Sequence, residues 1–483
     1  MIAMDNQMMI PSRLAFLEKI SFALLCALMA DCCIFGAGRV IMVGSLSLRM
    51  ALFGLTIVTA LPSMLRQWRS LLTNKILWAA AIWLAWLAIG VVMGLIKGNN
   101  IGVMIVDLKG FAYFALLPVA ICLLSGEDRT HTLMKVMMYA SGALGAVMLI
   151  HFALYLWDSE TFTVLYNWGL SRSFSAIARI TATMPRLFFY STNYLLVGCA
   201  FATYFQVVNK KLRLDMSLLT GVNLICLLMS YTRSVYLAVG IAIVVLVLGF
   251  VLFMGRAQAK RFWTHLCLSV VAFCLVLTAF GIATKTDYVS YAITRTLLSF
   301  DVPAVEAPVP EATEDVETDI TEPTKPTKPT KPTEPTKPVD LETQAHQAAT
   351  IASDQLRGNI QKELLKMIRK SPIIGNGLGA AIEWRAVNEY FYLDLIAKTG
   401  VIGLLLYFCP LLTAAILVLK QGKAYAQAKF RASAWTCVLL GFMAFSYFNP
   451  YMNAALGVLF YCCTLAAVNA ATNKGCRTHN YQT

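Results

Sequence analysis

Long apolar segments recur along the chain and are separated by short polar connections. These segments are about 17 to 24 residues long, the length at which an α-helix crosses the hydrocarbon core of a membrane. The pattern predicts an all-α polytopic membrane protein with about twelve transmembrane helices. The predicted spans are residues 17–35, 47–65, 76–96, 103–124, 132–156, 188–208, 216–232, 234–254, 264–283, 400–419, 433–448 and 454–471.

Basic residues alternate from one connection to the next. Connections after even-numbered spans are basic, as at Lys210, Lys211 and Arg213, whereas the short connections after odd-numbered spans carry little positive charge. Because basic connections stay in the cytoplasm, we expect both termini to be cytoplasmic. The two long connections, residues 157–187 and 284–399, are then extracytoplasmic.

The same alternation divides the chain into three parts. Residues 1–283 are expected to form nine spans, with an outward loop at 157–187. Residues 284–399 form a large extracytoplasmic loop before the last three spans. Residues 400–483 hold those three spans and a cytoplasmic tail.

The large loop is itself divided by composition. Residues 303–338 are rich in Pro, Thr and Lys, and proline recurs at every third position from Pro323 to Pro338. This pattern indicates a disordered or polyproline II spacer. An amphipathic helix is expected over about 351–370, followed by a Gly-rich and Glu/Tyr-containing patch at 371–399.

The expected helix has one apolar stripe. Ile360, Leu364, Met367 and Ile368 recur at helical spacing, basic residues occupy much of the remaining surface, and Pro372 ends the helix. We expect this helix to lie at the outer membrane surface, with its stripe toward lipid or toward the protein core.

Composition agrees with a membrane protein and argues against nucleic-acid binding. Hydrophobic residues make up 58% of the chain, charged residues 14%, and the net charge is +14. Residues 301–342 hold eleven acidic residues and four lysines, a net charge of −7, so the rest of the chain carries +21. Most of this excess positive charge lies in short connections between spans, where it indicates which side of the membrane each connection is on.

Cysteine and histidine positions give no sign of a metal site. Twelve of the thirteen cysteines fall in apolar spans, which is typical of small core residues. The five histidines are scattered without ligand spacing. We therefore expect no metal and no cofactor.

Two ionisable residues at the outer ends of spans are candidates for function. Arg233, in SYTRSVYLA, is a permanent planar cation suited to phosphate; its alternative role is an interfacial anchor. Glu389 lies beside Tyr390 and Tyr392, partly removed from water, where a carboxylate is suited to general-base catalysis. Its alternative role is to cap a short helix.

Other charged residues in the spans need ionic partners. Asp107 and Lys109 are two residues apart and do not share a helix face, so we expect them to pair with other spans. Asp31 and Arg49, near the outer ends of the first two spans, are expected to pair with each other.

Three segments resemble the O-antigen ligase and O-antigen polymerase (Wzy-type) superfamily of bacterial membrane glycosyltransferases. They are SYTRSVYLA at 230–238, LRGNIQKELLKMIRKSPIIGNGLG at 356–379 and EYFYLDLIAKTGVIGLLLY at 389–407. The resemblance covers roughly residues 170 to 470. It implies a GT-C-like arrangement of about twelve spans, in agreement with the hydrophobic pattern.

The resemblance also implies an activity and its partners. Such enzymes work at the outer face of the inner membrane, among membrane lipids, and take glycan from an undecaprenyl-diphosphate carrier without a metal. A second glycan or lipid-linked molecule is the acceptor, a chain-length regulator is a usual partner, and nucleic acid has no part.

Residue roles follow by similarity. Arg233 and Glu389 would be catalytic, with Glu389 taking the proton of the acceptor hydroxyl. Further arginines would bind the diphosphate, and residues around Glu389 would bind the acceptor sugar. The diphosphate candidates are Arg179, Arg186 and Arg357; the sugar candidates are Arg385, Asn388, Tyr390 and Tyr392.

One departure from the family pattern bears on the acceptor. The ligases carry a His at the position of Glu389, and their following Asn falls on Tyr390. This favours an O-antigen or capsule polymerase. The alternatives are a ligase acting on lipid A–core, a wall polymer or a protein, a flippase or transporter for the same lipid-linked glycans, and a non-catalytic membrane scaffold.

Overall fold

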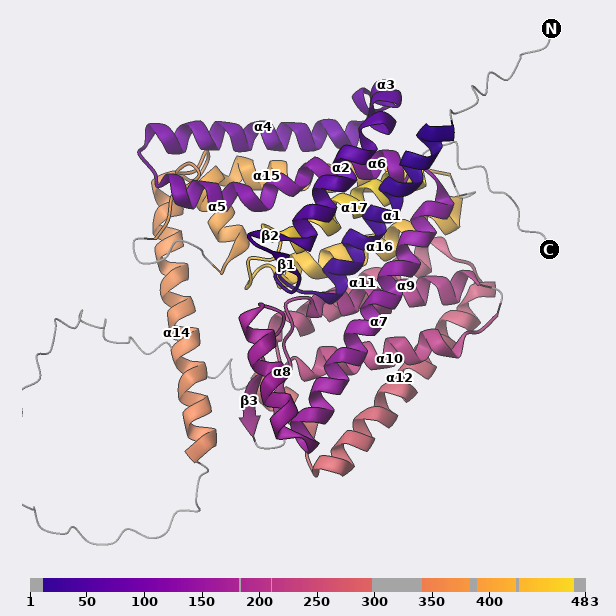
Figure 1. Cartoon of the computed structure of the whole chain (residues 1–483), viewed down its shortest axis with the longest axis vertical. Helices are drawn as coiled ribbons and strands as arrows, with labels where there is room; N and C mark the ends of the chain where they lie inside the picture. Colours follow the sequence, from indigo (N-terminus) through magenta and orange to yellow (C-terminus); the bar gives the residue numbers. More distant parts are fainter. Residues whose placement is uncertain are drawn as a thin grey trace, which may run out of the picture.

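The computed structural model describes residues 12–181, 184–209, 211–297, 341–382, 389–422 and 425–472, and they form a bundle of long helices (Figure 1). The bundle helices are α1 (Ser12–Ile34), α2 (Leu48–Arg66), α4 (Lys75–Ile96), α5 (Ile101–Phe111), η1 (Ala112–Ala115), α6 (Leu116–Leu123), α7 (Glu127–Trp157), α9 (Leu195–Val208), α10 (Leu214–Met229), α11 (Arg233–Phe253), α12 (Arg256–Thr284), α15 (Phe391–Leu419), α16 (Ala426–Phe445) and α17 (Ala455–Thr472).

Shorter elements and one long helix lie around this bundle. Two small antiparallel hairpins are present: Met42 lies opposite Ser47 in the first, and Ala178 lies opposite Arg186 in the second. The surrounding elements are α3 (Trp68–Leu72), α8 (Ser159–Ser171), η2 (Thr192–Tyr194), α13 (Tyr288–Leu297), α14 (Leu341–Lys370) and the strands β1 (Met42–Val43), β2 (Leu46–Ser47), β3 (Ala178–Thr181) and β4 (Met184–Arg186).

The predicted fold class is confirmed. Each predicted span coincides with a helix or with consecutive helices. Within the described residues, eight helices are long and apolar enough to cross a membrane, and Thr192–Val208 and Leu214–Met229 are shorter apolar helices. The exact count of twelve spans stays a prediction, because α1 carries four charged residues, α16 carries two, and two of the apolar helices are short. The two hairpins are small additions to an all-α architecture.

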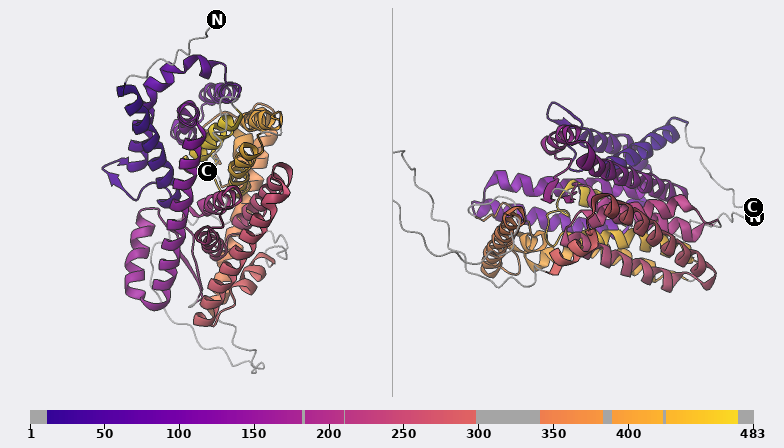
Figure 2. Two further views of the ribbon diagram at one scale, coloured as in Figure 1. Left: turned by 90° about the vertical axis from the view of Figure 1, so that its right-hand side faces the viewer. Right: turned by 90° about the horizontal axis from the view of Figure 1, so that it is seen from below.

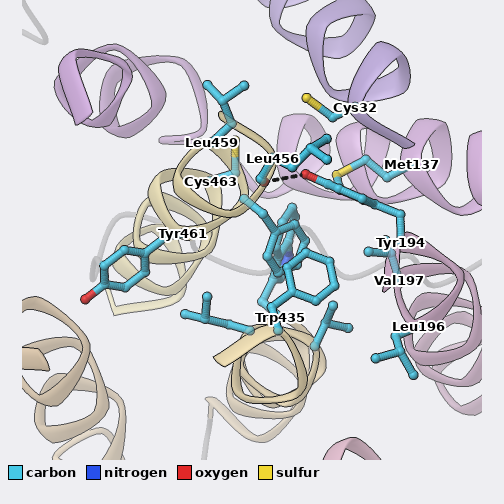
Figure 3. Packing of buried hydrophobic residues seen from close by; sticks show 14 of the residues in the cluster. Cys32, Met137, Tyr194, Leu196, Val197, Trp435, Leu456, Leu459, Tyr461 and Cys463 are labelled. Atoms are coloured by element: carbon cyan, nitrogen blue, oxygen red, sulfur yellow. Dashed lines mark hydrogen bonds between the residues drawn. The ribbon is translucent and has the colours of Figure 1, made fainter. Parts of the chain in front are cut away.

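Helix α17 lies at the centre of the bundle and α12 at its edge. Of the most apolar 18-residue window of each helix, 89% is buried in α17 and 6% in α12. Trp435 and Tyr461 are fully buried. Figure 3 shows the Tyr194 hydroxyl donating to the Leu456 carbonyl, at 2.7 Å. Cys32 and Cys463 are buried in this core, in the small-residue role expected for them.

Ion pairs join the bundle helices where charges are buried. Arg49 Nε lies 2.7 Å from Asp31 Oδ2, which confirms the predicted pair. Asp107 pairs with Lys398 of α15, so its predicted pairing with another span is also confirmed. Charged residues of α1 and α16 are neutralised similarly, through the pairs Glu18–Arg66, Glu18–Arg129 and Glu127–Arg431.

Helix α14 lies across the ends of α4 and α15, along one side of the bundle (Figures 1 and 2). It is ten residues longer at its start than the predicted helix at 351–370, and it ends at Lys370, before Pro372. Its stripe faces protein: Ile360 and Leu364 are fully buried. The spacer predicted at 303–338 lies outside the described residues.

Helix α15 begins at Phe391, whereas the sequence predicted a span from residue 400. The helix is interrupted at Gly400, whose φ of 71° is outside the helical region, so residues 391–399 form a separate segment in front of the predicted span. The segment before the break carries Asp394 and Lys398. Because charged residues lower the hydropathy of this segment, the hydrophobic pattern did not predict it as part of a membrane helix. Because Asp394 and Lys398 form an ion pair with each other, both charges can be buried in the helical turns that precede Gly400.

The Gly-rich turn at 371–379 fills this break in α15. Asn376 N and Gly377 N donate to the carbonyls of Ala397 and Lys398, both at 2.9 Å. On the other side of the break, Val401 N donates to Pro372 O at 2.9 Å. Backbone groups that an interrupted helix leaves unpaired are therefore satisfied by a neighbouring segment.

The turn is also pressed against α4. Leu378 N donates to Gly90 O at 2.9 Å, and a side chain at Gly377 would approach the backbone nitrogen of Gly94 to 2.5 Å. Because Gly377 also has a φ of +87°, both its conformation and its surroundings require glycine. The turn thus fixes α4 and α15 relative to each other next to the segment that carries Glu389.

Candidate active site

Most of the predicted site residues gather at the end of the bundle crossed by α14. Arg186, Arg233 and Arg357 lie there on β4, α11 and α14. Glu389 and Tyr390 lie on a fourth segment, directly before α15. Arg179 belongs to β3, which contacts α14, the helix of Arg357. Arg385 and Asn388 lie outside the described residues.

Arg357 and Glu389 form an ion pair that links α14 to the start of α15. Arg357 Nε donates to Glu389 Oε2 at 2.8 Å. The two side chains are 33% and 26% exposed, so the pair is half-buried and partly open to solvent. The sequence predicted a role for each residue but not their contact. A cation thus lies directly beside the candidate base.

A small apolar cluster holds this ion pair in place. Ile360 and Leu364, one and two turns beyond Arg357, pack with Ile382, Tyr390 and Ala397. Tyr390 directly follows Glu389 and is 6% exposed. Anchoring on both sides restricts the motion of the carboxylate, which is the condition for a positioned general base.

Arg186 lies against the turn that opens α11. Its Nε donates to Ser230 O at 3.2 Å, and its Nη2 donates to Thr232 Oγ1 at 3.1 Å. Arg233, the next residue, is half-buried at the first position of α11. The structure therefore brings two predicted phosphate-binding arginines onto one turn, although 46 residues separate Arg186 from Thr232 along the chain.

The connection between α16 and α17 joins this turn to the Glu389 region. Asn449 Nδ2 donates to Ser234 Oγ at 3.1 Å, next to Arg233. Two residues of the same connection, Tyr447 and Phe448, pack their rings against Tyr390 with centroid distances of 6.1 and 6.2 Å. The arginines and the carboxylate thus belong to one assembly of segments.

Tyr392 lies within the bundle. Its hydroxyl donates to Met443 O at 2.7 Å, and its ring stacks on Phe408. This hydrogen bond uses the phenolic proton inside the protein, so a contact of Tyr392 with substrate stays a prediction. Tyr390 contacts the assembly through its ring and stays a candidate.

Sequence reasoning missed a buried triad that joins α5 to the first turns of α15. Lys398 Nζ lies 2.7 Å from Asp107 Oδ1 and 2.8 Å from Asp394 Oδ2. Gly379 N donates to Asp107 Oδ2 at 3.0 Å, which ties the triad to the Gly-rich turn. The spacing of Asp394 and Lys398, four residues apart in an apolar segment, was the available signal.

The Gly-rich turn is not built as a phosphate cradle. A cradle requires backbone N–H groups that point at an anion. Here every N–H from Gly375 to Gly379 donates within the protein: Gly375 to Ser371 O, and the next four to α15, α4 and Asp107. The arginine side chains are therefore the remaining candidates for anion binding at this end.

The described residues include no group of three or more His, Cys, Asp or Glu side chains that could hold a metal ion. The described side chains at this site supply one carboxylate held by Arg357 and further arginines on an adjoining turn. This combination suits proton removal from a hydroxyl beside a leaving group that gains negative charge.

Comparison with known proteins agrees with this reading. A family model described as O-antigen ligase matches residues 218–408, which run from α10 through the Gly400 break. No curated protein matches the chain. The matched segment contains Arg233, Arg357 and Glu389, together with the three motifs quoted from the sequence. Over residues 218–408 the chain is therefore similar to the O-antigen ligase family.

Proposed function

We propose that this protein is an inverting, metal-independent glycosyltransferase that uses a polyprenyl-diphosphate-linked donor. It takes glycan from undecaprenyl diphosphate on the outer face of the cytoplasmic membrane and polymerises it into an O-antigen or capsule chain. The observation that carries the proposal is the Arg357–Glu389 pair, at 2.8 Å, within a segment matched by the O-antigen ligase family. The alternating basic connections support an outward-facing site.

The proposed reaction is an in-line displacement at the anomeric carbon of the donor. Glu389 accepts the proton of an acceptor hydroxyl as its oxygen attacks, and the bond from the anomeric carbon to the phosphate oxygen breaks. Undecaprenyl diphosphate leaves with the bonding electrons. Arg186, Arg233 and Arg357 stabilise the charge that develops on the diphosphate, and Arg179 is a further candidate for this role.

A ligase is the second candidate, because the matching family is described as O-antigen ligase. The donor chemistry would be unchanged, and the acceptor would be lipid A–core, a wall polymer or a protein. The Glu at position 389, where the ligases carry a His, favours the polymerase. The two candidates differ in the number of transfers onto one chain.

Product length therefore tests the proposal. Purified protein in detergent or vesicles is incubated with a diphosphate-linked oligosaccharide, with and without chelator, and the products are separated on a gel. A polymerase gives a chelator-resistant ladder, whereas a ligase gives one addition onto a separate acceptor. No consumption of any lipid-linked donor, combined with its movement across vesicle membranes, would instead support a flippase.

Arg233→Ala is expected to lower kcat/KM for the donor by roughly 10- to 100-fold, because it removes one charge-assisted contact to the diphosphate. The matched control is Arg213→Ala: Arg213 is exposed and pairs with Asp215 in another part of the chain. Initial rates at varied donor concentration give the effect. Equal rates for Arg233→Ala and the control would remove Arg233 from the donor site.

A further inference from the structure

A groove opens beside the candidate active site, between α14, the α4–α5 connection and the segment after the Gly-rich turn. Its volume is about 510 Å³, within the roughly 300–1,000 Å³ of small-molecule sites. Asn99 and Asn100 contribute from the α4–α5 connection, and Met367 and Lys370 from the last turn of α14. The groove is separate from the arginines and from Glu389, and none of the roles proposed above uses it.

The groove presents oriented amide groups. Asn99 Nδ2 donates to Asn376 O at 3.1 Å and to Leu378 O at 3.0 Å. Asn376 Nδ2 donates to Met367 O and to Ala397 O, both at 2.8 Å. Each amide thereby uses both of its N–H bonds on the protein. No described residue donates a hydrogen bond to Oδ1 of either side chain, so the groove offers two fixed acceptors for a ligand rich in donors.

The charge of the lining argues for a glycan over a diphosphate. Among the described residues that line the groove, Lys370 is the one ionisable residue, and it lies at the exposed end of α14. The backbone N–H groups of the adjoining Gly-rich turn are already used within the protein. Apolar side chains such as Val103 and Met367 complete the lining. Amide acceptors next to apolar surface match the hydroxyl groups and the C–H faces of sugars.

The groove is close to the candidate base. Ile382, which lines it, packs in the same apolar cluster as Tyr390, the residue after Glu389. Along α14, Met367 is ten residues beyond Arg357, about 15 Å at 1.5 Å per residue. A short oligosaccharide spans that distance, so a chain with one end at Glu389 can extend into the groove.

We propose that this groove is a subsite for the acceptor glycan, and that it holds sugar residues away from the reacting hydroxyl. The proposal rests on the proposed function, since it takes Glu389 to be the base that faces the acceptor. Binding energy from these remote sugars would position the hydroxyl for attack. The subsite recognises a hydroxyl-rich chain, whereas the arginines bind the diphosphate.

The proposal is tested with two variants that each place a bulky side chain in the groove, from different sides. Ala381→Trp places a large ring in the groove from the segment after the Gly-rich turn, and Val103→Trp does so from the first turn of α5. The control is Ile374→Trp, in the Gly-rich turn, because Ile374 is 46% exposed and does not line the groove. The acceptor probe is the free oligosaccharide released by mild acid from the diphosphate-linked donor.

Both groove variants are expected to raise KM for the free oligosaccharide at least tenfold, while KM for the lipid-linked donor changes less than twofold. The control should match wild type in both. Unchanged acceptor KM in the groove variant that retains wild-type thermal unfolding would overturn the proposal. Requiring two variants keeps the test usable if one of them fails to fold.

A binding measurement separates this proposal from the proposed function. Saturation-transfer NMR of the free oligosaccharide with purified protein needs no turnover. A signal that is present in wild type and lost in Ala381→Trp supports the subsite even if no donor is consumed, in which case the proposed function fails alone. If donor is consumed but the signal is the same in all variants, the groove proposal fails alone.

Discussion

Glu389→Gln is expected to lower kcat about 10²- to 10⁴-fold, the usual contribution of a positioned general base. Glutamine keeps an oxygen that accepts the hydrogen bond from Arg357 Nε, which is 2.8 Å from the carboxylate. The substitution therefore removes the proton acceptor while preserving the link between α14 and α15. Initial rates with saturating donor and acceptor measure the effect.

Two comparisons separate catalysis from positioning. Glu363→Gln, on the same helix as Arg357, is the control, because Glu363 is half-exposed and pairs with Lys366 on the surface. The pH profile is the second: the ionised carboxylate is the active form, so the wild-type rate should fall on acidification, and the residual rate of Glu389→Gln should lose that dependence. If Glu389→Gln retains more than a third of wild-type turnover, Glu389 is not the base.

Lys398→Met is expected to destabilise the fold by about 3–5 kcal/mol, because it leaves buried carboxylates without their cation. The side chains of Lys398, Asp107 and Asp394 are 4%, 10% and 10% exposed. Without the ammonium group, two like charges would face each other between α5 and α15. The measurement is thermal unfolding in detergent, with the recovery of monodisperse protein as a second readout.

The surface variant Lys366→Met is the matched control. Its side chain is 65% exposed and pairs with Glu363, and such surface pairs contribute about 0–1 kcal/mol. The triple variant Asp107→Asn, Asp394→Asn, Lys398→Met removes all three charges and should regain much of the loss. If Lys398→Met and Lys366→Met unfold at the same temperature, the triad does not hold α5 to α15.

The helices were predictable because the membrane imposes their length and polarity. Apolar runs long enough to cross a bilayer identify a span with little regard to its neighbours, so segments such as α4 and α11 were found within one residue at each end. The start of α15 was not, because Asp394 and Lys398 make its first turns polar. Lys398 also pairs with Asp107, 291 residues before it, and no local pattern contains that contact.

The candidate site was predictable residue by residue but not as an assembly. Arg357 and Glu389 stand out in sequence as charges beside a span, and the motifs suggest a role for each. Their contact depends on how α14 docks through Ile360 and Leu364, and the meeting of Arg186 with Thr232 depends on how β4 lies on the α11 turn. The groove beside α14 has no sequence signature, because its oriented amides come from two segments 277 residues apart.

The break in α15 limits how the protein can vary in length. Residues 391–399 are held at one end by the hydrogen bonds across Gly400 and along their length by the ion pair of Lys398 with Asp107. One residue inserted there would rotate Asp394 and Lys398 by about 100° around the helix axis and turn them toward apolar neighbours. Insertions before Leu341, where α14 begins, leave this register unchanged. Length variation among natural sequences of this kind should therefore gather before α14 and be excluded between Phe391 and Gly400.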